Sequence, residues 1–347
     1  MTADRIGLLG PLADPQLQAV AEALTRRGAE PVWINSEALE LQRPVWSDDG
    51  ILAIDGVALQ GLTAIYVRSL PSPHAPLLQR DGRWLQRDGD LVLRRDWYSG
   101  YMQSRERVGF LAASLLCLEA SGVRLVNPLQ AGMASQSKPL QLELLRRLGA
   151  PVPRTLISND PGRIRDFHAR ESARGSSVIY KPLLGGALTR PLDRDVLEHL
   201  EQVRAAPVIF QQRVDGDDIR VMVVGDAVVS AVAIQTPEPH LDFRGDPAYR
   251  AGTATYAPVE LPGPLALLCC RATAACGLRF AGLDLKRAPD GSWVVLELNS
   301  SPIYLDVERK MGDPISDALA GLLLNPGIAD AYAAPIPQTG QPWSGAL

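Results

Sequence analysis

The chain has 347 residues, of which 46% are hydrophobic and 21% are charged, and its formal net charge is −4. This length exceeds that of one ordinary hydrophobic core, so we expect two or three packed domains. The acidic balance argues against a general nucleic-acid-binding protein, because affinity for a phosphate backbone requires a surplus of lysine and arginine. No apolar run approaches the roughly 18 residues that a membrane helix needs. The start MTADRIGLLG is typical of a first strand and not of a signal peptide, so we expect a cytoplasmic protein without a membrane partner.

Residues 1–130 are predicted to form a parallel α/β domain. The segments RIGLLG, Pro15 to Arg27 and EPVWINS read in order as strand, helix and strand. GILAIDGVAL and TAIYVRS supply further short strands, whereas residues 79–97 are charged and poorly periodic, which favours a loop or a hairpin excursion. A helix from about Ser99 to Ala120 and a strand at VRLVNP complete this domain.

Residues 131–235 are predicted to form a small central α+β domain. It opens with the helical pattern SKPLQLELLRRLG, which ends at Gly149 and Pro151. SSVIYKPLLGGA then reads as a strand followed by a glycine turn. The DGDD and GD turns separate the strands that run on to residue 235.

Residues 236–330 are predicted to form a third domain. Its expected elements are a helix at 264–276, a hairpin at RFAGLDLKRAPDGSWVVLELN and a helix at about 313–324. Residues 331–347 are rich in proline and glycine and are expected to form a poorly ordered tail. The sequence therefore predicts a multidomain protein of the α/β and α+β classes.

Three polar residues interrupt the apolar pattern of the predicted hairpin: Asp284 in GLDLK, and Glu297 and Asn299 in LELNS. Side chains alternate along a strand, so Glu297 and Asn299 share a face, and Asp284 lies opposite them if the loop holds an even number of residues. Two facing carboxylates repel each other unless a cation compensates them, and Mg²⁺ favours one or two carboxylates plus substrate phosphates. The pattern indicates a metal-nucleotide site, with a solvated edge hairpin as the alternative.

Basic residues at the ends of predicted elements are candidates for binding phosphate. Lys181 ends the run SVIYK beside a glycine turn, whose backbone N–H groups can approach an anion. Asp218 and Arg220 share one face of the strand DDIRVMVVG, and a planar guanidinium suits a transferring phosphoryl group. Lys138 at a helix start and Arg250 in AYRAGT are further candidates. Ordinary surface lysines and arginines, or an exposed ion pair, explain each of these positions equally well when taken alone.

Taken in chain order, these segments resemble the ATP-grasp superfamily, and most closely its RimK-like and glutathione-synthetase-like carboxylate–amine ligases. The resemblance covers about residues 127–325 and implies an ATP-grasp fold preceded by an N-terminal parallel α/β domain. It implies that Lys138 and Lys181 touch the nucleotide phosphates and that Arg220 and Arg250 act on the transferred phosphate. The implied metal ligands are Asp284, Glu297 and Asn299.

The resemblance also implies contacts to the rest of the nucleotide and to the acceptor. The hinge strand would contact adenine, Asp218 would lie on the nucleotide side, Gly185 and Gly186 would form a lid, and the NSSP step would frame the acceptor substrate. The implied adenine contacts are Gln211, Gln212, Arg213 and Val214, and the implied acceptor contacts are Ser300 and Ser301. Arg68, at the end of AIYVR, is a candidate clamp for a substrate carboxylate, with a structural ion pair as the alternative.

The implied chemistry is the ATP-dependent condensation of a carboxylate with an amine, through an acyl phosphate, with ATP and Mg²⁺ or Mn²⁺ as cofactors. Three alternatives stay open at this point. The first is a ligase that adds an amino acid such as glutamate to a small molecule or a protein terminus. The second is a ligase that joins side chains within a ribosomal peptide, with residues 70–105 as a peptide-binding surface. The third is a small-molecule kinase of the same fold. A homo-oligomer is compatible with each.

Overall fold

A computed structural model describes residues 3–36, 43–48, 50, 52–54, 56–70, 78–80, 83–85, 91–92, 97–184, 187–236 and 241–325. The described residues divide into two compact units: those up to residue 129 together with 316–325, and those from 130 to 315. The predicted tail at 331–347 lies outside the described residues. Among the helices that the structure describes, none is both long and apolar enough to cross a membrane.

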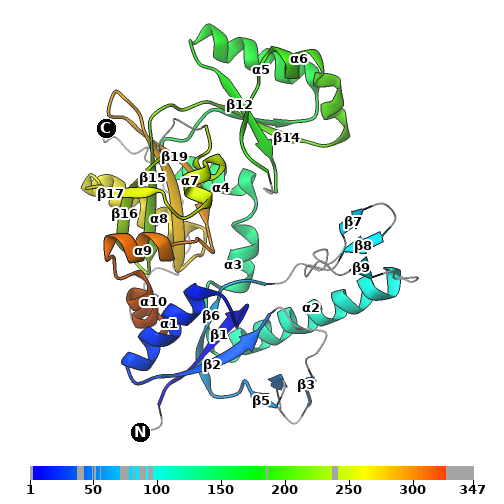
Figure 1. The fold of residues 1–347 in the computed structure, drawn as a ribbon, viewed down its shortest axis with the longest axis vertical. Coiled ribbons are helices and arrows are strands. Elements are labelled where there is room, and N and C mark those ends of the chain that lie inside the picture. Colours follow the sequence, from blue (N-terminus) through cyan, green and yellow to red (C-terminus); the bar gives the residue numbers. More distant parts are fainter. Residues whose placement is uncertain are drawn as a thin grey trace. The chain divides into compact units, whose positions relative to one another are not determined.

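The first unit is built on a parallel sheet of the order β10-β6-β1-β2 (Figure 1). Its strands are β1 (Arg5–Gly10), β2 (Glu30–Asn35), β6 (Leu62–Val67) and β10 (Arg124–Val126). Its helices are α1 (Pro15–Arg26), α2 (Trp97–Ala120) and α10 (Ile315–Leu324). The predicted strand–helix–strand opening is confirmed, because β1 and β2 pair in parallel on either side of α1 in the sequence.

Two small antiparallel sheets accompany this parallel sheet. One contains β3 (Pro44–Trp46), β4 (Leu52–Ile54) and β5 (Val57–Ala58), and the other contains β7 (Leu78–Arg80), β8 (Arg83–Leu85) and β9 (Leu91–Val92). The second sheet falls in the charged segment 79–97, for which a loop or a hairpin excursion was the prediction.

Helix α10 belongs to the first unit, although the sequence grouped it with residues 236–330. Arg27 pairs with Asp317 of this helix at 2.5 Å, and the Arg124 Nη2 atom donates to the Leu323 carbonyl at 2.6 Å. Its sequence ISDALAGLLL is largely apolar and needs a partner surface, which proximity along the chain cannot identify.

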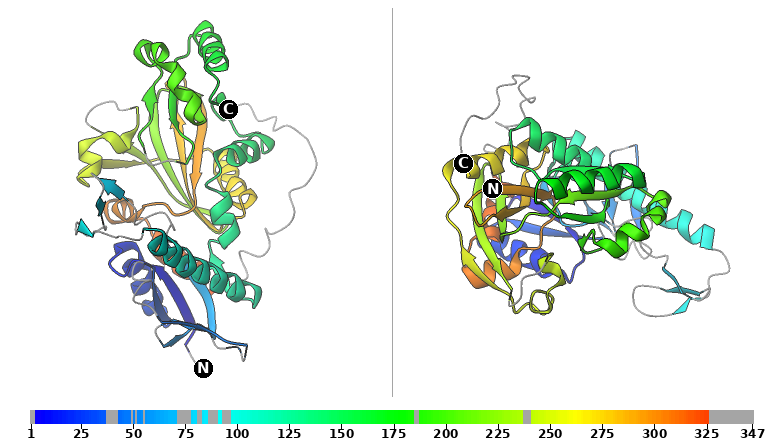
Figure 2. Two further views of the ribbon diagram at one scale, coloured as in Figure 1. Left: turned by 90° about the vertical axis from the view of Figure 1, so that its right-hand side faces the viewer. Right: turned by 90° about the horizontal axis from the view of Figure 1, so that it is seen from above.

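The second unit contains two antiparallel sheets. The four-stranded sheet has the order β11-β14-β12-β13, with strands β11 (Thr155–Ser158), β14 (Val208–Gln212), β12 (Val178–Pro182) and β13 (Arg190–Pro191). The five-stranded sheet has the order β17-β16-β15-β18-β19, with strands β17 (Thr255–Pro258), β16 (Ala227–Gln235), β15 (Asp217–Val224), β18 (Phe280–Arg287) and β19 (Trp293–Asn299). Figure 2 shows the green strand β15 and the orange strands β18 and β19 running side by side.

The pairing of β15 differs from the sequence grouping, which placed residues 217–235 in the central domain. β15 pairs with β18 over its whole length, and β16 pairs with β17. Local patterns identify strands but not their partners, because pairing depends on residues some 60 positions apart in the chain. The boundaries 1–130, 131–235 and 236–330 stay predictions.

The remaining elements of the second unit are short or flank the sheets. They are α3 (Leu129–Ala134), α4 (Lys138–Arg147), α5 (Pro161–Ala173), α6 (Arg194–Glu198), η1 (Leu200–Ala205), η2 (Phe243–Gly245), α7 (Pro247–Arg250), α8 (Gly263–Ala275) and α9 (Leu305–Met311). The predicted helix at 264–276 is confirmed as α8.

Three helices begin with the same Asp-Pro pair. Asp14, Asp160 and Asp246 each precede a proline and accept a hydrogen bond from the backbone N–H two residues later, at 2.8, 2.8 and 2.6 Å. Proline in the first turn lacks an N–H that would otherwise go unpaired there, and the aspartate satisfies another. The local sequence therefore determines where α1, α5 and α7 start.

One face of the five-stranded sheet is apolar, and the other combines polar side chains with buried apolar ones such as Met222 and Phe280. Ile219, Val221, Leu283 and Val295 are at most 1% exposed and belong to a core that includes Leu265 of helix α8. Side chains alternate along each strand, so the intervening residues of β15, β18 and β19 point to the opposite face. This opposite face carries the polar side chains that the sequence singled out.

Candidate active site

The hairpin of β18 and β19 brings the two predicted metal-binding carboxylates together. Asp284 and Glu297 are direct cross-strand partners, which confirms the predicted arrangement, and Gly282 lies opposite Asn299. The register shifts between Asp284 and Leu285, so a local irregularity follows the carboxylate pair. Directly opposed carboxylates are destabilising unless cations compensate them.

Arg220 supplies one of these cations from the neighbouring strand. In the β15–β18 pairing it lies opposite Asp284, and its Nε atom is 2.5 Å from Asp284 Oδ1. Both atoms are buried and neither makes a well-aligned hydrogen bond within the described structure. The guanidinium also lies 5.7 Å from the centre of the Phe243 ring, a cation–π contact.

Two lysines compensate the negative charge of Glu297. Lys138 Nζ is 3.0 Å and Lys181 Nζ is 3.7 Å from the same oxygen, Glu297 Oε2. Lys138 is the first residue of α4 and Lys181 lies in β12, so two elements converge on one carboxylate. The structure therefore brings both predicted phosphate lysines to the predicted metal ligands.

The ionisation of this cluster follows from burial and mutual charge. Burial opposes the charge of Glu297, but Lys138 and Lys181 outweigh it and lower the pKa of this carboxyl group. Burial raises the pKa of Asp284, and the adjacent Glu297 adds to the effect while Arg220 opposes it. Burial also lowers the pKa of Lys181, against the field of Glu297.

Gln141 docks helix α4 on strand β19 and was not singled out from the sequence. Its side-chain amide donates to the Leu298 carbonyl at 2.8 Å and accepts from the Leu298 N–H at 3.1 Å. It also donates to the Ser135 carbonyl, and only 2% of the residue is exposed. Leu298 lies between Glu297 and Asn299, so this contact places the helix that carries Lys138. A glutamine three residues after a helix-opening lysine gives no sequence signal for this role.

Arg244 is a second residue that the sequence did not single out. Its guanidinium pairs with Asp242 at 2.6 Å, and this hydrogen-bonded contact is the main reason that its pKa is raised. The charge of Arg244 also acts on Glu297, Asp284 and Lys181. An aspartate two residues before an arginine in LDFRG was the only available signal.

Arg250 is engaged within its own loop. It is exposed, and its Nε atom donates to the Arg244 carbonyl at 3.0 Å. Arg250 therefore supports the backbone that carries Arg244, and its predicted contact with a transferred phosphate stays a prediction.

The predicted adenine contacts lie in β14 and directly after it. Gln211 is buried and donates through its side chain to Thr155 Oγ1 at 2.9 Å, and Gln212 N donates to the Arg154 carbonyl at 2.8 Å. Arg213 pairs with Asp215 at 2.7 Å. The predicted lid residues Gly185 and Gly186 lie outside the described residues.

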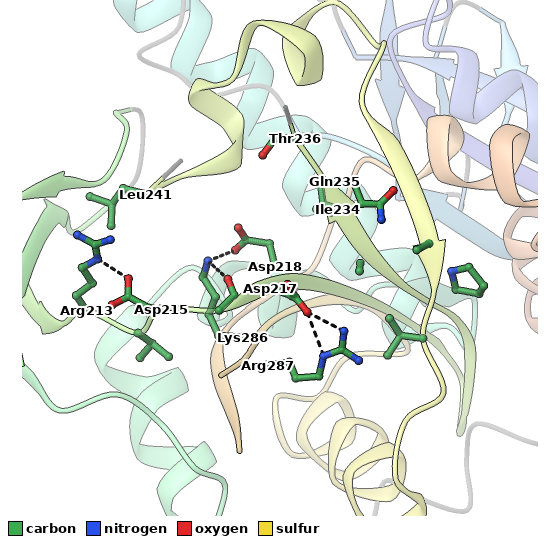
Figure 3. Close-up of a pocket in the computed structure, with 16 residues that line it drawn as sticks. Arg213, Asp215, Asp217, Asp218, Ile234, Gln235, Thr236, Leu241, Lys286 and Arg287 are labelled. Atoms are coloured by element: carbon green, nitrogen blue, oxygen red, sulfur yellow. Dashed lines mark hydrogen bonds and ion pairs between the residues drawn. The ribbon is translucent and has the colours of Figure 1, made fainter. Parts of the chain in front are cut away.

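A cavity of about 670 Å³ adjoins these residues and is shown in Figure 3. Three predicted nucleotide residues line it: Arg213, Val214 and Asp218. Lys286 also lines it and pairs with Asp218 at 2.9 Å, while its Nζ atom donates to the Gly216 carbonyl at 3.1 Å. Burial raises the pKa of Asp218, although Lys286 opposes the shift.

Gly216 makes the close approach of two strands possible at the edge of this cavity. Its φ is +134°, and a Cβ atom there would lie 2.1 Å from the Arg287 carbonyl oxygen. Any side chain would displace backbone, so only glycine fits the DGDD turn before β15.

Asn299 and the residues after it form a turn at the end of β19. Asn299 is exposed, and its Oδ1 atom accepts from the Ser301 N–H at 3.0 Å. Ser300 and Ser301 are half-buried. This places the predicted acceptor residues directly beside the predicted metal ligands in the chain.

Arg68 forms an ion pair in the first unit. Its Nε atom lies 2.9 Å from Asp14 Oδ2, and the two side chains are only 13% and 15% exposed. The same aspartate caps helix α1, so the pair joins the end of β6 to the start of α1. This is the structural alternative to the predicted carboxylate clamp.

The donor set fits Mg²⁺ bound together with a nucleotide. Within the described ranges there is no group of three or more His, Cys, Asp and Glu residues placed to hold a metal ion. The cluster offers two carboxylates, and Asn299 follows Glu297 by two residues; such a set suits an ion that completes its shell with water and phosphate oxygens. Asp284 Oδ1 is buried and lies 2.5 Å from Arg220 Nε, so this carboxylate already faces a cation in the structure.

Comparisons with known proteins support the resemblance. The family model of the RimK-like ATP-grasp domain matches residues 135–323. A probable alpha-L-glutamate ligase of Marinobacter nauticus is 32% identical over 222 residues, which cover 61% of this chain and 70% of that protein.

Solved structures match over more of the chain. The ATP-grasp ligase PsnB, complexed with minimal precursor, is 33% identical with a TM-score of 0.78, and the match covers 93% of this chain and 99% of PsnB. PsnB has also been solved with precursor peptide PsnA2 and AMPPNP, and with minimal precursor, Mg and ADP. The macrocyclase MdnC of Microcystis aeruginosa is 20% identical with a TM-score of 0.74 and shares the fold. This protein therefore belongs to the RimK-like ATP-grasp family, whose members are C–N bond-forming ligases that use ATP and Mg²⁺.

Proposed function

We propose that this protein activates a carboxylate by phosphorylation from ATP and joins it to an amine through an acyl phosphate, with release of ADP and phosphate. The observation that supports this most directly is the facing pair of Asp284 and Glu297, with Lys138, Lys181 and Arg220 in contact with it. A facing carboxylate pair surrounded by cations could hold a metal ion that would neutralise charge on the phosphates of a nucleotide.

The charges of the site suit the triphosphate. Three cationic side chains contact two carboxylates, and Arg244 adds a fourth positive charge nearby. When bound, Mg²⁺ would be held by Asp284, Glu297 and Asn299 and would neutralise charge on the phosphates. Lys138 and Lys181 would bind phosphate oxygens, and Arg220 would stabilise the phosphoryl group during transfer.

The chemistry then depends on positioning and not on a protein nucleophile. The substrate carboxylate attacks the γ-phosphorus and ADP leaves, which gives the acyl phosphate. The amine attacks the acyl carbon, phosphate leaves, and the amine nitrogen loses a proton. Arg220, Arg250 and Lys181 are the proposed catalytic side chains, and Arg213, Val214 and Asp218 contribute to the nucleotide cavity.

We propose a peptide as the substrate, with the bond formed between side chains. The match to PsnB spans nearly the whole chain, including the first unit, and PsnB is seen with a precursor peptide. The match to the glutamate ligase covers only 61% of this chain. Addition of a free amino acid to an acceptor is the second candidate, which the identity to glutamate ligases favours.

The test is ADP release from Mg²⁺-ATP with pooled peptides and amino acids, compared with Glu297→Ala, followed by mass spectrometry of the product. A peptide that loses one water indicates an internal condensation, either an amide or an ester. A gain of one amino acid residue indicates ligation, and a gain of phosphate alone indicates a kinase. Absence of ATP binding by the wild-type protein would contradict the proposal.

A further inference from the structure

Asp242 has the most extensive set of charge-assisted contacts near the site. Its Oδ1 atom accepts from Arg244 Nε at 2.8 Å and from Arg244 N at 3.2 Å, and its Oδ2 atom accepts from Arg244 Nη2 at 2.6 Å and from Thr189 N at 3.1 Å. The carboxylate side chain is 7% exposed, whereas that of Arg244 is 51% exposed. A fork-to-fork pair of this kind determines where the guanidinium lies.

The contacts of Asp242 join two parts of the second unit. Thr189 directly precedes β13, which pairs with the strand β12 that carries Lys181, and Arg244 belongs to η2, the short helix that Asp242 caps. Phe243 in the same turn lies against the Arg220 guanidinium, and Leu188 packs 3.4 Å from the Cβ position of Gly245. The Asp242 carboxylate therefore connects the segment after Lys181 to the turn that contacts Arg220.

Arg244 itself lies within electrostatic reach of the carboxylate cluster. Its charge acts on both Asp284 and Glu297, and it disfavours the charge of Lys181. Asp242 neutralises part of this charge and fixes the position of the guanidinium.

We propose that Asp242 is a positioning residue that presents Arg244 to the terminal phosphate of the bound nucleotide. The inference rests on the proposed function and adds to it a residue that acts through Arg244. Arg244 would then discriminate a triphosphate from a diphosphate, because only the triphosphate carries the terminal phosphate that the guanidinium would contact.

The experiment compares binding of Mg²⁺-AMPPNP and Mg²⁺-ADP by isothermal titration calorimetry. The proteins are the wild type, Asp242→Asn, Arg244→Ala and the double variant. We expect Asp242→Asn and Arg244→Ala each to weaken AMPPNP binding by about tenfold, the order of one charge-assisted contact, and ADP binding by less than about twofold. In the Arg244→Ala background, Asp242→Asn should cause no further loss.

Glu171→Gln is the matched control. Glu171 is a buried carboxylate held by Arg154 at 2.6 Å and Arg174 at 2.9 Å, and none of the proposed nucleotide contacts includes it. This variant should lower thermal stability but leave the ratio of the two nucleotide affinities unchanged.

Each result has a distinct meaning. Equal weakening of both nucleotides by Asp242→Asn would make Asp242 a structural residue only and overturn the inference, as would a further loss in the double variant. If Asp242→Asn does not fold, the affinities of Arg244→Ala alone test the inference. An unchanged ratio of the AMPPNP and ADP affinities in Arg244→Ala would overturn it. Failure of the wild-type protein to bind either nucleotide would instead contradict the proposed function.

Discussion

Gln141 and Leu298 exchange two hydrogen bonds, so that a helix side chain pairs with a strand in the way that a neighbouring strand would. The Gln141 amide donates to the Leu298 carbonyl at 2.8 Å and accepts from the Leu298 N–H at 3.1 Å. Because Leu298 separates Glu297 from Asn299, the contact sets the distance between the helix of Lys138 and the strand of the proposed metal ligands.

Gln141→Leu is therefore expected to destabilise the fold and the site together. The substitution leaves a buried backbone N–H and C=O without partners, which costs on the order of 2 to 4 kcal/mol in the free energy of unfolding. Denaturant unfolding and Mg²⁺-ADP titration measure the two effects. The neighbouring Leu140 is 42% exposed, so Leu140→Ala serves as the control and should change neither. Normal nucleotide affinity in a folded Gln141→Leu variant would contradict this role.

Lys138 and Lys181, which both pair with Glu297, are expected to strengthen phosphate binding. Lys138→Met and Lys181→Met each remove a cation from a partly buried site, and we expect ADP release to fall by about 10². Steady-state ADP assays with the active peptide pool check this. Arg194→Met, which removes a side chain that is 90% exposed, should leave the rate unchanged. A loss of less than about twofold in both lysine variants would argue against phosphate contact.

The dependence of ADP binding on Mg²⁺ distinguishes the proposed role of Glu297 as a metal ligand from that of the lysines as phosphate contacts. In the wild type, removal of Mg²⁺ with EDTA should weaken ADP binding, because the proposed carboxylates would hold the ion and the ion would neutralise charge on the phosphates. Glu297→Gln should abolish this Mg²⁺ dependence and leave metal-free ADP binding intact or stronger, because Lys138 and Lys181 lose their competing anion. Titrations with and without EDTA provide the comparison. An unaltered response to Mg²⁺ in Glu297→Gln would exclude this carboxylate as a ligand.

Glu171 makes the stability of the second unit depend on pH. Hydrogen bonds from Arg154, supported by Arg174, lower the pKa of this carboxyl group below its ordinary value of 4.5. Its stabilising contribution is therefore fully present above the unfolded pKa and is lost as the pH falls through the folded pKa. Glu171→Gln should cost on the order of 1 to 3 kcal/mol near neutral pH, and the difference from wild type should shrink in acid.

Urea unfolding of both proteins at about pH 7 and about pH 4 measures this difference, because the lower value lies close to the unfolded pKa. The exposed pair of Arg204 and Glu201 provides the control, since Glu201→Gln should have little effect at either pH. A difference between Glu171→Gln and wild type that does not vary with pH would contradict the expectation.

The sequence by itself determined the local elements and the family, and it predicted the chemistry of the site. Strand alternation places Glu297 and Asn299 on one face, and the hairpin pattern brings Asp284 opposite Glu297. Asp-Pro pairs start three helices, and the order of lysine, arginine and acidic residues was enough to identify the family. Each of these features depends on residues that are neighbours in the chain or on a fixed order of motifs.

Only the tertiary structure decided which distant elements pair. It showed that β15 joins the sheet of β18 and β19, and that Arg68 pairs with Asp14. It also revealed the contact between Gln141 and Leu298, 157 positions apart, and that between Asp242 and Thr189, 53 positions apart. Such contacts depend on the packing of whole elements, and the periodicity of a single segment carries no information about its partner.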